Sequence, residues 1–199
     1  QKTKRSIATL ATAILAFSAI QNNDRVGLVL FSDHVEQYLH PRKGRSHGLR
    51  LLSTLLHAPV GRKTDIIDAL ESINRLQRRR AVVFLLSDFL QPNIDQTLAV
   101  TAKRHDLIGM TIRDPREQEI PNVGLIELRD LETGQTQMVD TTSRKTRGYL
   151  NSRLRAQDTR IDRIFRRSNI DHIRLSTDQS DISRPLIEFF HRRSAKKGG

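Results

Sequence analysis

The sequence predicts a doubly wound α/β domain, with a mostly parallel sheet flanked by helices. The first observation is three apolar runs of strand length, at Val26–Phe31, Ala81–Leu86 and Leu107–Ile112. Each run is nearly continuous rather than alternating, which is typical of parallel strands covered on both faces. The second observation is that amphipathic helical patterns separate the runs, as crossover connections require. Because 199 residues are enough for one core and few for two, we expect residues 1–199 to form a single domain.

Local patterns place the other elements of the N-terminal two thirds. Apolar residues predict a buried helix over Ile7–Ile20. Val35–Leu39 follows the first run too closely for a crossover, so we predict an antiparallel strand there. Apolar residues at helical spacing predict three further helices, over Leu49–Leu56, over Ile66–Leu76 after a Thr64-Asp65 cap, and over Ile94–Ala102.

The C-terminal third is predicted to hold a hairpin, two basic helices and a last strand. The hairpin spans residues 124–140, with a glycine-containing connection between Gly124–Asp130 and Gln135–Asp140. Basic helices are predicted within residues 143–197, the first from about Ser143 and the second over Ile182–Phe190 with Pro185 in its first turn. The first of these helices has a core stripe of Leu150, Leu154, Ile161, Ile164 and Phe165, and the strand is Asp171–Leu175. We expect Ser194–Gly199 to be a frayed tail.

Composition narrows the class of protein. The fractions of 37% hydrophobic and 28% charged residues are typical of a folded globular chain, and no run of 18 apolar residues predicts a membrane span. The absence of cysteine excludes disulfides, thiolate metal sites and cysteine nucleophiles. We therefore expect a cytoplasmic protein without a membrane segment.

The net charge of +12 is concentrated near the C-terminus, where residues 143–199 carry 15 Lys and Arg against 6 Asp and Glu. This excess favours either a surface for nucleic acid or an acidic partner, or an ordinary solvated helix face.

Polar pairs follow all three apolar runs: Ser32-Asp33, Ser87-Asp88 and Arg113-Asp114. In open α/β sheets ligands bind outside the carboxyl ends of the strands, and carboxylates there can hold Mg²⁺. The alternative is that each Asp only begins a turn. Gly61–Asp65 does not match a phosphate-binding loop, but Thr64 is a good helix N-cap whose hydroxyl could face the same strand ends. The sequence shows no paired nucleophile and base, so we expect no enzyme activity.

Four stretches of the chain resemble the von Willebrand factor A-like domain of the bacterial domain-of-unknown-function family fifty-eight. In order along the chain, they are Asn23–Asp33, Pro41–Gly44, Gly61–Asp65 and Val82–Phe89. Three later stretches extend this resemblance over essentially the whole chain: Arg104–Asp106, Asp114–Glu117 and Ile120–Gly124.

The resemblance implies a metal-ion-dependent adhesion site, built from a D-x-S-x-S motif, a Thr in a later loop and an Asp after the fourth strand. Thr64 and Asp88 match the last two elements, whereas the sequence shows no D-x-S-x-S. We therefore expect an N-terminally truncated domain without its first central strand. Mg²⁺ is expected in the intact domain and not in this chain. Ser87 and Asp65 join Thr64 and Asp88 as expected partner-binding residues.

Three functions follow from these observations. The first is a non-enzymatic protein-interaction module that acts with a MoxR-type AAA+ ATPase or its client, as the resemblance implies. The second is a Mg²⁺-dependent phosphoryl-transfer or nuclease-type enzyme, which requires Asp33, Asp88 and Asp114 to converge. The third is nucleic-acid binding by the basic C-terminal helices.

Overall fold

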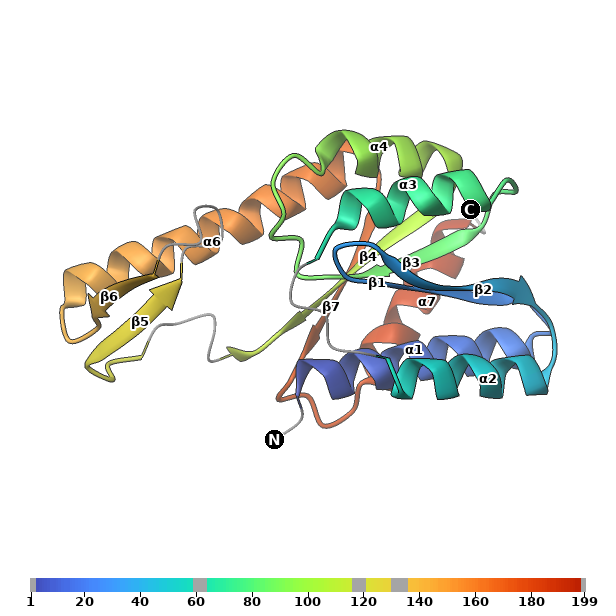
Figure 1. The fold of residues 1–199 in the computed structure, drawn as a ribbon, viewed down its shortest axis with the longest axis horizontal. Coiled ribbons are helices and arrows are strands. Elements are labelled where there is room, and N and C mark those ends of the chain that lie inside the picture. The colour runs from blue at the N-terminus through green and yellow to red at the C-terminus, as the bar shows by residue number, and fades with distance from the viewer. Residues whose placement is uncertain (1–2, 59–63, 116–120, 130–135, 198–199) are drawn as a thin grey trace.

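A computed structural model describes residues 3–58, 64–115, 121–129 and 136–197 (Figure 1). Its centre is a parallel three-stranded sheet in the order β3-β4-β7, formed by β3 (Val82–Leu86), β4 (Asp106–Arg113) and β7 (Asp171–Ser176). The register pairs Leu86 with Met110 and Ile112 with Leu175. The mixed α/β class with a parallel sheet is therefore confirmed. Strands β3 and β4 lie where their apolar runs predicted them, and β7 lies at the last strand predicted over Asp171–Leu175.

Strand β1 (Val26–Phe31) pairs only with β2 (Val35–Arg42), antiparallel, among the described residues. The antiparallel strand is as predicted, although it continues to Arg42 rather than ending at Leu39. The prediction that Val26–Phe31 is a strand buried on both faces is wrong, because its residues are half-buried or exposed. Within the described ranges, no ladder of hydrogen bonds joins β1 to β3.

Helices cover the parallel sheet on both faces (Figure 1). One face packs against α3 (Ile66–Leu76), α4 (Asp95–Arg104) and the second half of α6 (Arg144–Arg167), through a core that includes Leu70, Leu98 and Phe165. The other face packs against α1 (Lys4–Gln21) and α7 (Ser183–Lys197), with Ile7 and Leu186 in its core. Helix α2 (Arg45–Leu56) lies beside α1 and packs Leu51 toward β2.

Gly109 in β4 has no side chain because the ring of Phe165 occupies the space. A Cβ at this position would lie 2.2 Å from the Cε2 atom of Phe165. The Phe165 ring also meets Phe89 edge to face, with ring centroids 5.0 Å apart. This glycine therefore lets α6 approach the sheet closely enough to bury Phe165.

The second half of α6 lies on the sheet, and its first half extends past it beside the hairpin of β5 (Leu125–Arg129) and β6 (Thr136–Asp140) (Figure 1). The start of this helix was predicted correctly, since Ser143 is its N-cap and accepts from Thr146 N. In the predicted stripe Ile161, Ile164 and Phe165 are buried, whereas Leu150 and Leu154 are half-buried. The predicted connection 131–134 lies outside the described residues.

The frayed tail predicted from Ser194 is wrong up to Lys197, because α7 continues to that residue. Arg193 explains the extra turns. Its guanidinium bonds to Asp106, lies 3.6 Å from a carboxylate oxygen of Asp171, and covers the ring of Phe189. These contacts hold the end of α7 against the sheet. No helix in the described parts of the chain is long and apolar enough to cross a membrane.

Candidate functional site

The carboxyl ends of β3 and β4 meet at the edge where the sequence placed the site. Ser87 N donates to Met110 O at 3.1 Å, so the ladder continues one residue past β3. The loop then turns sharply at Phe89, which has a φ of 56° and a fully buried ring. A non-glycine residue in the left-handed region is uncommon and needs surrounding contacts to hold it. The burial of Phe89 thus fixes the backbone that presents Asp88.

Ser87 and Asp88 both bond to the loop that they begin. Ser87 Oγ accepts from Phe89 N at 3.2 Å, and Asp88 Oδ1 accepts from Leu90 N at 3.2 Å. This is the turn-forming role that Ser and Asp commonly have. The Asp88 side chain is nevertheless exposed, so its second carboxylate oxygen is not required by the turn.

Asp65, and not Thr64, is the N-cap of α3. Its Oδ1 accepts from Ile67 N at 2.9 Å and from Asp68 N at 3.1 Å. The predicted capping role of Thr64 is therefore wrong. Both residue types are good N-caps, and Asp65 takes the position because α3 begins one residue later. Thr64 is exposed next to the cap.

The same carboxylate connects the loop after β3 to the start of α3, through Gln91. Gln91 Nε2 donates to Asp65 Oδ1 at 3.0 Å, while Gln91 Oε1 accepts from Ile66 N at 2.6 Å. Asp65 N in turn donates to Ser32 O, at the end of β1, at 2.6 Å. The hydrogen bond from Gln91 and those from the α3 backbone hold the pKa of Asp65 below its ordinary value, against a smaller opposing effect of burial. Asp65 thereby ties three loops together.

Gln91 was not among the site residues predicted from the sequence. The available signal was an amide side chain in the loop that follows Ser87-Asp88, but its partners lie 25 and 26 residues away.

The other two strand-end carboxylates do not join Asp88. Asp33 is exposed, and its Oδ1 accepts from His34 Nδ1 at 2.7 Å and from Ser32 Oγ at 3.2 Å. The His34 bond lowers the pKa of Asp33. Asp33 directly follows Ser32, whose carbonyl oxygen accepts from Asp65 N. Asp114 follows β4. Among the described residues no three His, Asp or Glu side chains gather into a group that could hold a metal ion, so Asp33, Asp88 and Asp114 do not converge.

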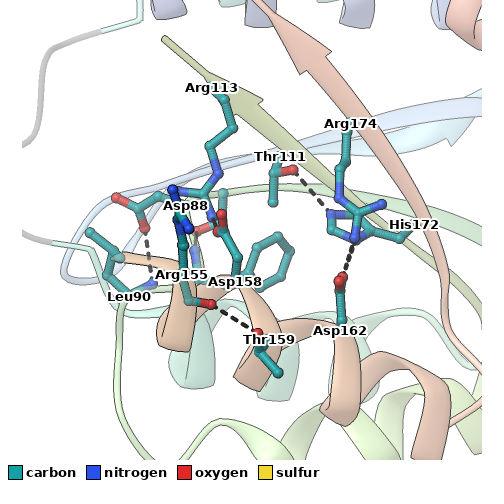
Figure 2. Close-up of polar contacts among 12 residues, drawn as sticks. Asp88, Leu90, Thr111, Arg113, Arg155, Asp158, Thr159, Asp162, His172 and Arg174 are labelled. Carbon is teal, nitrogen blue, oxygen red and sulfur yellow. Dashed lines mark hydrogen bonds and ion pairs between the residues drawn. The ribbon is translucent and has the colours of Figure 1, made fainter. Parts of the chain in front are cut away.

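Helix α6 brings a network of polar side chains to this end of the sheet (Figure 2). Asp158 accepts from the guanidinium of Arg113, and Asp162 accepts from that of Arg174. Figure 2 shows Asp88 in the same group as Arg113, Arg155 and Asp158, at the carboxyl ends of β3 and β4.

A chain of three side chains lies behind this network, in which Thr111 is buried and His172 and Asp162 are half-buried. His172 Nδ1 is 3.2 Å from Asp162 Oδ1, and His172 Nε2 is 3.0 Å from Thr111 Oγ1 (Figure 2). Since the carboxylate only accepts, Nδ1 carries the proton and Nε2 accepts from the Thr111 hydroxyl. Burial lowers the pKa of His172, with a further contribution from Arg174.

The order Thr, His and Asp is that of a nucleophile, a base and an orienting acid. However, Thr111 is 1% exposed, so a substrate cannot reach its hydroxyl. The hydrogen-bonded side chains of Thr111, His172 and Asp162 instead fasten α6 to β4 and β7. Two sequence patterns indicated these contacts between α6 and the sheet: Asp158 and Asp162 are one helical turn apart, and His172 and Arg174 lie two residues apart in β7.

The residues present do not by themselves form a magnesium site. Thr64 and Asp88 offer one hydroxyl and one carboxylate, whereas Mg²⁺ takes six oxygen ligands in near-octahedral geometry. Asp65, the nearest carboxylate in sequence to Thr64, already accepts three hydrogen bonds. Any cation at Asp88 would need ligands beyond those that the described residues supply.

Comparison with known proteins identifies relatives. Residues 1–160 match the family described as Protein of unknown function DUF58. An uncharacterized protein of Mycobacterium tuberculosis is 33% identical over 135 residues, which cover 66% of this chain and 43% of that protein. An uncharacterized protein of Mycobacterium avium is 32% identical over 153 residues, or 75% of this chain and 89% of that protein. The chain thus spans less than half the length of the M. tuberculosis relative.

Solved structures show a similar fold. The conserved hypothetical protein BatB from Bacteroides thetaiotaomicron superposes with a TM-score of 0.52 at 16% sequence identity, over 96% of this chain and 89% of that one. At this identity the likeness concerns the arrangement of strands and helices alone.

Proposed function

The chain belongs to the DUF58 family, and we propose that it is a non-enzymatic protein-interaction module that binds its partner at the carboxyl edge of the sheet. The observation that carries this proposal is the hydrogen-bonding of Asp65. It fixes the end of β1, the start of α3 and the loop after β3 in one arrangement. Segments that hydrogen bonds already hold in place before binding lose less conformational entropy on association.

We call the surface formed by the end of β1, the start of α3 and the loop after β3 the carboxyl-edge platform. Its exposed side chains are those expected of a recognition surface. Thr64 and Asp88 are exposed, and Ser87 is half-buried beside them. They offer hydroxyl and carboxylate groups to a partner, and Figure 2 draws Asp88 in one group with Arg113 and Arg155. A binding face that carries both signs of charge orients the partner protein and selects among partners more than it raises the affinity of binding.

We propose a MoxR-type AAA+ ATPase, or a client of that ATPase, as the partner, and the cytoplasm as the location. The support for both is the likeness to the family and the cysteine-free composition. Mg²⁺ at this edge is proposed only for a chain that adds a D-x-S-x-S motif, since Thr64 and Asp88 make an incomplete set of ligands. For the chain described above we expect no magnesium binding.

The test is capture of a purified MoxR-type ATPase from the same genome on the immobilised chain. Asp88→Ala should reduce the captured amount at least tenfold and leave the thermal midpoint unchanged within about 2 °C, because Asp88 is exposed. Glu71→Ala is the matched control, an exposed carboxylate on α3 away from the edge. Equal capture by the Asp88→Ala and Glu71→Ala variants would reject the carboxyl edge as the binding face.

The enzyme alternative has little support in the geometry, because its three carboxylates do not converge among the described residues and the Thr111 hydroxyl is buried. The nucleic-acid alternative has one supporting observation, the exposed arginines of α6.

A further inference from the structure

A small hollow lies between the start of α4 and the second half of α6. It is lined by Asp95, Arg160, Arg163, Ile164, Arg167 and Ser168, and has a volume of about 250 Å³. Its apolar floor is Ile164, which is 6% exposed. None of these residues takes part in the carboxyl-edge platform, although Asp95 directly follows the loop that carries Asp88.

The hollow holds an excess of positive charge. Arg160, Arg163 and Arg167 lie on one face of α6 at spacings of three and four residues, where like charges repel. Asp95 is the single carboxylate in the lining, and its Oδ1 is 3.5 Å from Arg160, at the limit of a hydrogen bond. Three arginines against one aspartate leave a formal charge of +2.

Two of these arginines are available for binding. Arg163 and Arg167 are exposed, and neither forms an ion pair or side-chain hydrogen bond with another described residue. The helix dipole explains basic residues in the last turn of a helix, which accounts for Arg166 and Arg167. It does not account for Arg160 or Arg163, which lie before that turn.

Size and chemistry decide what the hollow can bind. Pockets for small ligands and cofactors have volumes of roughly 300–1,000 Å³, so this hollow is better matched to one or two side chains. Arginine suits carboxylates because its planar guanidinium can form two parallel hydrogen bonds with them. The lining contains no aromatic ring on which a nucleic-acid base could stack.

We propose that this hollow binds the Asp and Glu side chains of an acidic segment in a partner protein. The proposal concerns a second surface and does not depend on the carboxyl-edge platform. A partner segment would place one carboxylate between Arg163 and Arg167 and compete with Asp95 for Arg160.

The probe is a fluorescein-labelled peptide of ten glutamates, titrated with the full chain at low salt and followed by fluorescence anisotropy. A decaglutamine peptide gives the background. The variant R163Q/R167Q should weaken the peptide's Kd about tenfold, the sum of two partly exposed ion pairs. The control R153Q/R192Q removes two exposed arginines elsewhere and should change the Kd less than twofold. Matching circular dichroism of the variants shows that each is folded.

A second variant tests the competition within the hollow. Asp95→Asn frees Arg160 and should tighten the Kd two- to threefold, while the charge-matched control Glu71→Gln should leave it unchanged. Equal weakening in R163Q/R167Q and R153Q/R192Q would overturn the proposal, because it would show general attraction to a basic protein. A single-stranded or duplex oligonucleotide that binds more tightly than the peptide, and loses more affinity in R163Q/R167Q, would also overturn it in favour of nucleic acid.

Discussion

Replacing Asp65 by alanine should destabilise the fold by about 2–3 kcal/mol. An N-cap replaced by alanine costs about 1 kcal/mol, and here the cap bonds to Ile67 N and Asp68 N are both lost. Loss of the bond from Gln91 adds about 1.5 kcal/mol, the lower end for a charged acceptor, because Asp65 is only half-buried. The free energy of unfolding from urea denaturation measures the sum.

Three further variants separate these contributions. Asp68→Ala removes a first-turn carboxylate that caps nothing, so we expect a loss below about 1 kcal/mol. Asp65→Asn keeps a good N-cap and should fall between the alanine variant and the wild type. In a double-mutant cycle with Gln91→Ala, the coupling free energy should be about 1 kcal/mol, as for residues in direct contact.

The pH dependence supplies an independent check. Because folding lowers the pKa of Asp65 below its ordinary value of 3.8, its ionised form stabilises the fold above that pH. This contribution is lost as the pH falls through the pKa of the folded state. Asp65→Asn should therefore lose less stability on acidification than the wild type. A loss below about 0.5 kcal/mol in Asp65→Ala, or one equal to that in Asp68→Ala, would refute the role of Asp65 as the tie between the loops.

Three other predictions test the packing and the buried histidines. Gly109→Ala should destabilise the fold by about 1–3 kcal/mol, because the new Cβ overlaps the ring of Phe165. Gly148→Ala should instead stabilise the fold by about 0.5–1 kcal/mol, because Gly148 has open space around it in α6. His105→Leu should be neutral or stabilising by thermal denaturation at pH 7, because neither buried ring nitrogen has a partner among the described residues; a loss above about 2 kcal/mol would contradict this. Burial lowers the pKa of His172 in the folded state, so wild-type stability should fall as the pH drops below about 6.5, and less so in His172→Gln.

The sequence predicted the elements whose signal is local. Strands β3 and β4 were predicted because their apolar runs have strand length, and α3 because its apolar residues recur at helical spacing. The pairing of β1 was not fully predictable, since an apolar run does not show whether one face or both are covered. In the structure its residues are at most half-buried.

Long-range contacts account for what the sequence did not show about the site. Thr64 and Asp65 are equally good caps by residue type, and the choice of Asp65 is reinforced by Gln91, which is 26 residues away. The chain from Asp162 through His172 to Thr111 joins residues up to 61 positions apart. The extension of α7 depends on Arg193, whose partner Asp106 is 87 positions away.

Hydrogen–deuterium exchange of the chain, with and without its captured ATPase partner, tests most directly whether the carboxyl edge is the binding face. If the partner binds at the carboxyl-edge platform, we expect the backbone amides of residues 64–68 and 87–91 to exchange more slowly when the partner is bound. Helices α1 and α2, on the far side of the sheet, should exchange as before. Protection confined to α1 and α2, with residues 64–68 and 87–91 unchanged, would contradict the proposal that this domain recognises its partner at the edge that carries Asp88.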